Sequence, residues 1–168
     1  TLLLTRQGKV LTLGCSDDGQ RGFDPSRVAS TLTNEVKLNG GYDDRKPLQA
    51  EKIAAGANHS VVLAENGDVY AFGSNEYGQC GTDKNVRINE DGEEERGPIL
   101  SPVKIDIPSQ ASRIVSISAG YAHTVLTDDK DNVFVFGQNA NGQLGIGRSS
   151  YSDEPTDVIV PTPIKFSE

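Results

Sequence analysis

Short apolar runs separated by polar turns form the main pattern along this chain. The runs at 61–63, 69–72 and 133–136 are rich in β-branched and aromatic residues, and the last two end at a glycine. Such runs are typical of β-strands. Asn66-Gly67 separates the first two, and Asn-Gly is a favoured hairpin turn. The pattern therefore predicts antiparallel hairpins, with no helical period of 3.6 residues.

Further apolar segments flank each hairpin. Residues 52–56 and 114–120 precede the hairpins, and segments that begin at a proline, 102–105 and 163–166, follow them. Asp131 takes the place of the turn glycine in the second hairpin, and aspartate tolerates the left-handed region better than most residues. Four short strands per unit predict a four-stranded antiparallel sheet.

The chain contains an internal repeat. Residues 56–81 align with residues 120–145 without a gap, and residues 1–22 align with residues 60–81. The offsets are 64 and 59 residues, so the unit is about 60 residues long. An all-β chain made of repeated four-stranded antiparallel sheets is predicted to form blades of a β-propeller.

Each repeat carries one copy of a glycine-rich loop: GCSDDGQRG at 14–22, GSNEYGQCG at 73–81 and GQNANGQLG at 137–145. The glycine spacing matches a phosphate-binding loop, but glutamine replaces the lysine that reaches the phosphates. We therefore expect structural turns that bind no nucleotide. In these turns the glycines have positive φ, and Asn75, Asn139 and the glutamines hydrogen-bond loop backbone. Gly81 is expected at a close backbone approach. The turn residues are Gly19, Gln20, Gly78, Gln79, Gly142 and Gln143.

The combined motif resembles the repeat of the regulator of chromosome condensation family. A-G-x-x-H-[ST] stands at residues 55–60 and 119–124, and each copy is followed by a hairpin and G-x-N-x-x-G-Q-x-G. Propeller repeats of the WD and kelch types are shorter. The first copy departs from the pattern at Ser16, which replaces the loop asparagine, and no aromatic residue precedes Gly14.

The resemblance implies a ring of seven blades, of which this chain supplies roughly three. We therefore interpret residues 1–168 as a partial β-propeller. Residues 1–22 are the end of one repeat, 23–81 the second, 82–145 the third and 146–168 the start of a fourth. Remaining blades, or self-association, are expected to cover the open faces of the end sheets.

Composition narrows the classes of partner. The net charge is −8, which argues against broad contact with nucleic acid. No apolar run approaches the roughly 20 residues of a membrane helix. The two cysteines, Cys15 and Cys80, form no metal-binding pair, and a reduced chain in the nucleus or cytoplasm is expected. No cofactor is predicted.

Covalent catalysis is not predicted. His59 and His123 are the only histidines, at equivalent positions of two repeats. We expect them to have structural hydrogen-bonding roles and to be held apart by neighbouring blades. His59, Ser60 and Asp68 cannot form a triad, because adjacent strand residues point to opposite faces.

Strand alternation predicts that one rim of the propeller collects the long polar segments. These are the glycine-rich loops, the turns at 57–58 and 121–122, and the insertions 23–47 and 82–98. The acidic run at 90–95 is either a mobile solvated loop or a contact surface for a basic partner. Loops on a rigid scaffold often bind partners. The predicted partner-binding rim consists of Asp17, Asp18, Asn58, Glu76, Tyr77, Tyr121, Asn141, Glu93, Glu94 and Glu95.

Two functions follow from the resemblance. The first is a non-catalytic scaffold for protein–protein interaction and regulation. The alternative is guanine-nucleotide exchange on a Ran-like small GTPase, the activity of the founding member. An exchange factor acts by stabilising the nucleotide-free GTPase, which requires differential binding and no bond chemistry. In both cases the partner is a protein, with no membrane contact. The photoreceptor branch of the family is not favoured, because the sequence contains no Trp.

Overall fold

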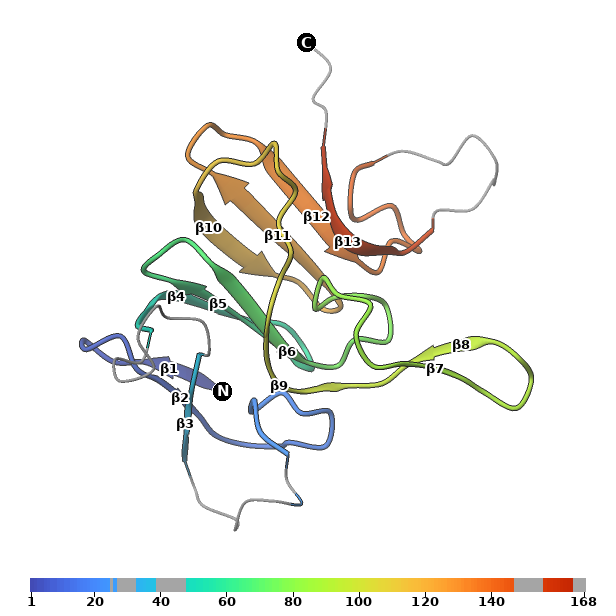
Figure 1. The fold of residues 1–168 in the computed structure, drawn as a ribbon, viewed down its shortest axis with the longest axis horizontal. Helices are drawn as coiled ribbons and strands as arrows, with labels where there is room; N and C mark the ends of the chain where they lie inside the picture. Colours follow the sequence, from blue (N-terminus) through green and yellow to red (C-terminus); the bar gives the residue numbers. More distant parts are fainter. Residues whose placement is uncertain (25, 27–32, 39–47, 147–155, 165–168) are drawn as a thin grey trace.

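The computed structural model describes residues 1–24, 26, 33–38, 48–146 and 156–164, and in this part the regular structure is all β (Figure 1). The first strands are β1 (Leu2–Leu4), β2 (Val10–Thr12) and β3 (Asn34–Val36). The middle of the chain forms β4 (Ala50–Ala55), β5 (His59–Ala64), β6 (Val69–Gly73), β7 (Val86–Ile88), β8 (Glu94–Arg96) and β9 (Ile99–Lys104). The last strands are β10 (Ile114–Ala119), β11 (His123–Asp128), β12 (Val133–Gly137) and β13 (Val158–Pro163).

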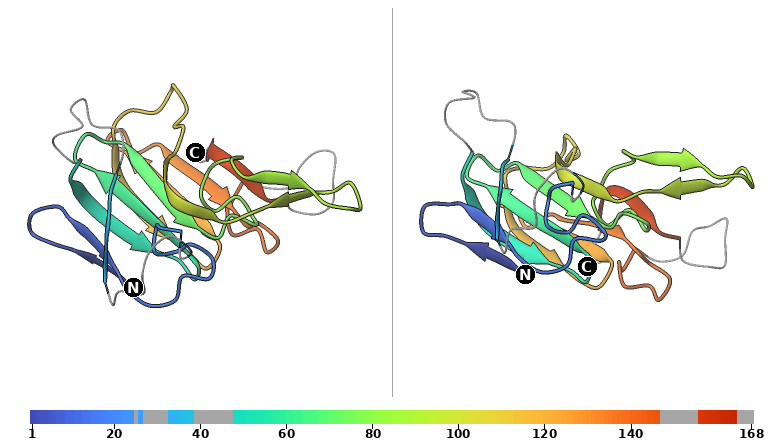
Figure 2. Two further views of the ribbon diagram at one scale, coloured as in Figure 1. Left: turned by 60° about the horizontal axis from the view of Figure 1, so that its bottom comes forward. Right: turned by 90° about the horizontal axis from the view of Figure 1, so that it is seen from below.

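The strands form successive antiparallel sheets that lie side by side (Figures 1 and 2). Two sheets have four strands, in the orders β4-β5-β6-β9 and β10-β11-β12-β13, and the sheet β1-β2-β3 precedes them. Each sheet is one propeller blade. The predicted fold class, β-propeller blades made of four-stranded antiparallel sheets, is confirmed.

The hairpin turns have the predicted backbone. Gly67 has a φ of 88°, and its N–H donates to the carbonyl of Ala64. Asp131, at the equivalent place in the next blade, has a φ of 62°. An Asp in the left-handed region thus replaces the turn glycine, as the sequence predicted.

The two segments that begin at a proline, 102–105 and 163–166, are not equivalent in the structure. Val103 pairs with Ala71 on β6, and Thr162 pairs with Val135 on β12, so the equivalent of Pro102 is Pro161 and not Pro163. Both prolines lie inside their strands, next to a register shift. Proline is tolerated there because β9 and β13 are edge strands with an irregular ladder. Cross-strand pairing, and not the position of a proline in the sequence, sets the register. Residues 165–168 of the predicted segment lie outside the described residues.

Both insertions contain strands that the sequence pattern did not reveal. Within 23–47, β3 pairs with β2 through Val10 and Val36 and completes the first sheet. Within 82–98, β7 and β8 form an antiparallel ribbon that projects away from the sheets (Figures 1 and 2). The sequence analysis predicted no strands within 82–98. Each of these strands has three residues, which is too few to show a period of two.

Burial of each sheet depends on its neighbours. Every residue of β5 and β6 is buried, because the middle sheet is covered by a sheet on each face. In β11 buried residues alternate with half-buried ones, since among the described strands only those of the middle sheet pack on its sheet. The core is centred on Tyr70, Phe72 and Phe136.

Candidate functional site: a rim of loops between blades

In both four-stranded blades the glycine-rich loop and the turn before the second strand lie at the same end of the sheet. The backbone N–H of Ser74 donates to the carbonyl of Asn58 at 2.8 Å, and the N–H of Gln138 donates to the carbonyl of Ala122 at 2.8 Å. Each glycine-rich loop therefore starts beside the turn that precedes the second strand of its blade. The hairpin tips around Gly67 lie at the opposite ends of the strands.

Side-chain amides hold the glycine-rich loops in shape. The Oε1 atom of Gln79 accepts the N–H of Tyr77 at 2.9 Å, and the Oδ1 atom of Asn75 accepts the N–H of Cys80 at 3.0 Å. The Nδ2 group of Asn75 also donates to the carbonyl of Thr82. The predicted hydrogen bonds to loop backbone are confirmed. They recur in the other two loops, through Gln20, Asn139 and Gln143.

The loop glycines adopt the predicted left-handed backbone. Gly19, Gly78 and Gly142 have φ values of 74°, 78° and 71°. Gly81 has a φ of 67° as well as the predicted close approach, because a Cβ there would lie 2.9 Å from the ring of Phe136. These loops are therefore structural turns.

The first and second loops also pack on the next blade, which the sequence analysis missed. A Cβ on Gly78 would lie 2.7 Å from the Cα of Ile159 in β13, and one on Gly19 would lie 3.0 Å from the Cα of Leu100 in β9. The loop backbone then accepts a hydroxyl from the second strand of that blade. Thr124 Oγ1 donates to the carbonyl of Gln79 at 2.8 Å, and Ser60 Oγ donates to that of Gln20 at 2.9 Å. The Ser or Thr that ends the A-G-x-x-H-[ST] motif was the sequence feature that could have predicted this hydrogen bond between blades.

His59 completes this link between blades. Its Nε2 atom lies 2.9 Å from Thr124 Oγ1. Because the Thr124 hydroxyl donates its proton to Gln79, Nε2 must carry the imidazole proton and donate. The Nδ1 atom is then an acceptor, and it has no hydrogen-bond partner in the described structure. The structural role predicted for His59 is confirmed.

Burial, followed by the charge of His123, lowers the pKa of His59 to about 4. The two histidines therefore interact electrostatically across neighbouring blades. Among the described residues, no group of three or more His, Cys, Asp and Glu side chains could hold a metal ion.

An aromatic and acidic cluster lies where the second loop meets the next blade. Tyr121 is 76% exposed, and Tyr77 is half-buried. The charge of Glu76 is the largest cause that raises the pKa of Tyr77, followed by burial and a hydrogen bond to Glu76, with contributions from Asp157 and Tyr121. These four side chains, which come from two blades, therefore share one patch of the rim. Asn58, also exposed, belongs to the same rim.

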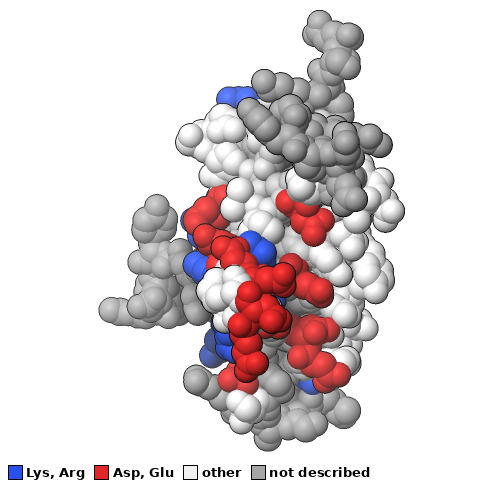
Figure 3. Space-filling model, turned by 90° about the vertical axis from the view of Figure 1, so that its right-hand side faces the viewer, with Lys and Arg blue, Asp and Glu red and all other residues white. Residues whose placement is uncertain are grey.

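The other predicted rim residues are spread over separate elements. Asp17 and Asp18 lie in the first loop and Asn141 in the third, while Glu93, Glu94 and Glu95 belong to the β7–β8 ribbon. Figure 3 views the molecule from the side on which the ribbon projects and shows Asp and Glu side chains concentrated there. The structure thus gives a tyrosine-containing patch and an acidic arm, not one continuous site.

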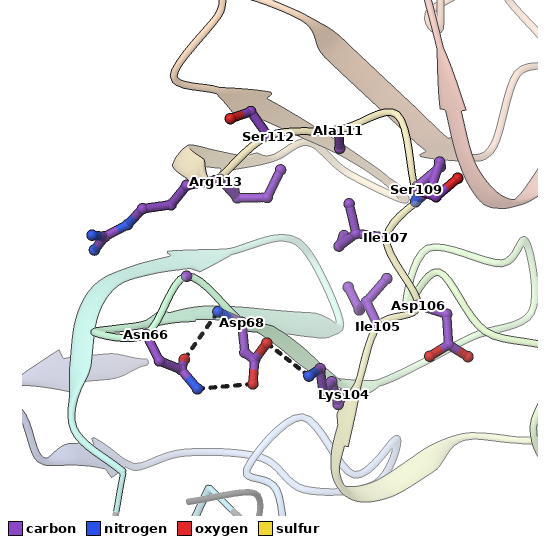
Figure 4. Close-up of a pocket in the computed structure, with 13 residues that line it drawn as sticks. Asn66, Asp68, Lys104, Ile105, Asp106, Ile107, Ser109, Ala111, Ser112 and Arg113 are labelled. Carbon is purple, nitrogen blue, oxygen red and sulfur yellow. Dashed lines mark hydrogen bonds and ion pairs between the residues drawn. The ribbon is translucent and has the colours of Figure 1, made fainter.

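A pocket at the opposite rim was not predicted. It has a volume of about 570 Å³ and lies between the hairpin tip at 66–68 and the segment 104–114 that joins two blades (Figure 4). Asp68 forms an ion pair with Lys104 at 2.7 Å and accepts a hydrogen bond from the Asn66 side chain at 2.9 Å. Asp68 and Lys104 in its lining therefore neutralise each other. Only tertiary structure brings the connecting segment over the hairpin tip.

Comparison with known proteins gives one family. Two family models described as "Regulator of chromosome condensation (RCC1) repeat" match the chain. One matches residues 50–79 and 114–143, and the other matches 66–127 and 130–168. Among the described residues, no helix is long and apolar enough to cross a membrane.

The similar curated proteins are longer than this chain. "Ultraviolet-B receptor UVR8" of Arabidopsis thaliana is 34% identical over 89% of the chain and 30% of its own length. "Regulator of chromosome condensation" of Xenopus laevis is 33% identical over 94% of the chain and 33% of its own length. "RCC1-like G exchanging factor-like protein" of Homo sapiens is 30% identical over 88% of the chain and 31% of its own length. The chain thus spans about a third of the length of these relatives.

Solved structures agree on the fold. Yeast RCC1 (Prp20) in its complex with Kap60 superposes with a TM-score of 0.75 at 24% identity, covering 99% of this chain and 35% of that chain. Prp20p from Saccharomyces cerevisiae, described with its binding properties to Gsp1p and histones, gives a TM-score of 0.75 at 23% identity, covering 99% and 36%. At these identities the likeness shows the fold alone.

Proposed function

This chain belongs to the Regulator of chromosome condensation (RCC1) repeat family, and we propose on that basis that it is a non-catalytic scaffold for protein–protein interaction and regulation. The carrying observation is the rim patch of Glu76, Tyr77 and Tyr121, which two rigid blades hold in place. Tyr121 is exposed and Tyr77 half-buried, and tyrosines are favourable contact residues because they bury a large area at a low cost in conformational entropy.

The side chains that resemble catalytic groups support a scaffold, because they connect blades. His59 donates to Thr124, and Thr124 donates to the backbone of Gln79. Gln79 itself occupies the position at which a phosphate-binding loop has its lysine. We infer that the chain does no covalent chemistry and that its activity is binding.

Site-specific photo-crosslinking can test the scaffold proposal. A crosslinking amino acid would replace Tyr121 on the loop rim or, as a matched control, Lys130 at a hairpin tip on the opposite rim; both positions are exposed. We expect adducts with a protein partner in cells from position 121 and none from position 130. Equal labelling at both positions, or none at 121, would contradict a binding function of this rim.

Nucleotide exchange on a Ran-like small GTPase is the second candidate. The similarity to "RCC1-like G exchanging factor-like protein" favours it. The test measures release of fluorescent GDP from a Ran-like GTPase in the presence of this protein. Accelerated release that is lost in Tyr121→Ala would support exchange. Binding of the GTPase without acceleration would support the scaffold.

We also propose that the protein is intracellular, nuclear or cytoplasmic, and that further blades or a second copy cover its end sheets. Cys15 and Cys80 are both free, which suits a reducing compartment. Leu3 and Val160 are exposed on the first and last sheets, and exposed apolar surface favours association. Light scattering of residues 1–168 over a range of concentrations tests the second copy; a constant monomer mass would exclude it.

A further inference from the structure

The β7–β8 ribbon pairs with no third strand in the described part of the chain. It follows the second glycine-rich loop, projects from the rim and returns through Gly97-Pro98 into β9 (Figures 1 and 2). A two-stranded ribbon is marginally stable by itself in water. Among the described strands nothing covers either of its edges, so both can accept another strand.

The hydrogen bonds at the two ends of the ribbon determine which backbone groups face outwards. The N–H of Asn89 donates to Glu93, and the N–H of Gly97 donates to Asn85. Pairs that exchange hydrogen bonds alternate with pairs that do not along an antiparallel ladder. The residues of the non-bonded pairs turn their N–H and C=O groups to the edges. These are Val86 and Ile88 on β7, and Glu94 and Arg96 on β8.

The two edges differ in charge. Glu93, which precedes β8, and Glu94 and Glu95 in β8 are exposed, and because successive residues point to opposite faces, both faces beside this edge carry carboxylates. Arg96 of the same strand forms an ion pair with Glu94 at 3.0 Å, so three carboxylates stand against one guanidinium and the edge stays negative. On β7, Arg87 would repel a basic strand. Opposite charges on neighbouring strands stabilise their pairing, so a basic strand favours the β8 edge.

An exposed apolar residue adds to this surface. Ile88 is 66% exposed and lies directly across the ribbon from Glu94, on the same face. Lysine and arginine have long aliphatic stems that cover apolar surface while their charged ends remain in water. A basic side chain that reaches Glu94 can therefore pack its stem on Ile88.

We propose that the β8 edge of this ribbon is a docking strand for an extended, Lys- and Arg-rich segment of a protein partner. The segment adds a third strand by backbone hydrogen bonds to Glu94 and Arg96, and Glu93, Glu94 and Glu95 select its positive charge. Nucleic acid and anionic membranes have the wrong sign of charge for this edge. The inference rests on the proposed scaffold function and specifies the chemistry of one partner.

The probe is a short peptide of alternating Lys and Val, with a peptide of alternating Glu and Val as the control. Binding to the 168-residue chain is measured by calorimetry and by NMR amide shifts. We expect saturable binding of the basic peptide only, with the largest shifts at residues 93–97. Affinity should fall as salt rises, because exposed charges are screened.

Proline variants test which edge is used. Glu94→Pro removes an outward N–H and leaves the hydrogen bonds of the ribbon intact, and Val86→Pro does the same at the β7 edge. We expect Glu94→Pro to weaken peptide binding by roughly tenfold, from one lost hydrogen bond and one lost charge pair. Glu94→Gln, which loses the charge alone, should cost about threefold. Val86→Pro should leave the affinity unchanged.

Several outcomes would overturn the proposal. They are equal binding of the acidic peptide, equal weakening by Val86→Pro and Glu94→Pro, tighter binding of duplex DNA than of the basic peptide, and shifts confined to other elements. The scaffold function is tested separately. If crosslinking at position 121 persists in Glu94→Pro and the basic peptide does not bind, the rim function stands and the ribbon proposal fails.

Discussion

Replacing Gly78 by alanine tests whether the glycine-rich loops hold neighbouring blades together, and Gly142 provides the matched control. Both glycines have a φ near +75°, at 78° and 71°, so alanine at either site costs about 1–2 kcal/mol of backbone strain. At Gly78 the new methyl group would also lie 2.7 Å from the Cα of Ile159. At Gly142 it would meet no atom of the described residues within 4 Å.

The contact with Ile159 determines how much more Gly78→Ala destabilises the protein than Gly142→Ala. Forcing a methyl group against fixed backbone adds about 1–3 kcal/mol, so Gly78→Ala should destabilise the protein by about 2–5 kcal/mol and Gly142→Ala by about 1–2 kcal/mol. Urea unfolding followed by far-UV circular dichroism measures both values, because the chain has no Trp to report by fluorescence.

Asparagine variants separate the two causes. Asparagine tolerates positive φ but has the same Cβ as alanine. We therefore expect Gly142→Asn to recover most of the lost stability and Gly78→Asn to recover little. Equal destabilisation by Gly78→Ala and Gly142→Ala, or full recovery by Gly78→Asn, would refute packing of the loop on the next blade.

Three further predictions concern the link between blades and the loop chemistry. Thr124→Val should destabilise by about 1–3 kcal/mol in urea unfolding, because it leaves His59 and the Gln79 carbonyl without a partner, whereas Thr124→Ser should lose much less; equal losses would contradict the hydrogen-bonded link. His59 has a folded-state pKa of about 4, below its unfolded value of 6.5, so the unfolded state binds more protons between these pH values and stability falls as pH falls from 6.5 to 4. The loss is on the order of 3 kcal/mol, and unfolding of His59→Gln should lack this component; an unchanged pH dependence would show that His59 does not cause it. Calorimetry should detect no saturable micromolar binding of GTP or ATP, because the loops lack the phosphate-binding lysine; such binding would overturn their interpretation as structural turns.

The sequence by itself determined the repeated unit and its local chemistry. Hairpins, positive φ at Gly78 and Gly142, and hydrogen bonds from Asn75 and Gln79 depend on residues close together in the chain. Local chemistry fixes such features, so they appear in every repeat. The rim could also be predicted, since strand alternation alone decides the end from which each loop leaves.

Tertiary structure decided the strand pairing and the contacts between neighbouring blades. Strand β3, the register of Pro161, the contact of Gly78 with Ile159 and the pairing of His59 with Thr124 depend on neighbours that are distant in sequence. The β7–β8 ribbon is too short to show a period, and its outward edge is defined only by its hydrogen-bond register. The sequence analysis identified Glu93–Glu95 as an acidic run. Their position along an open strand edge depends on the folded ladder, because a shift by one residue would turn every side chain to the opposite face.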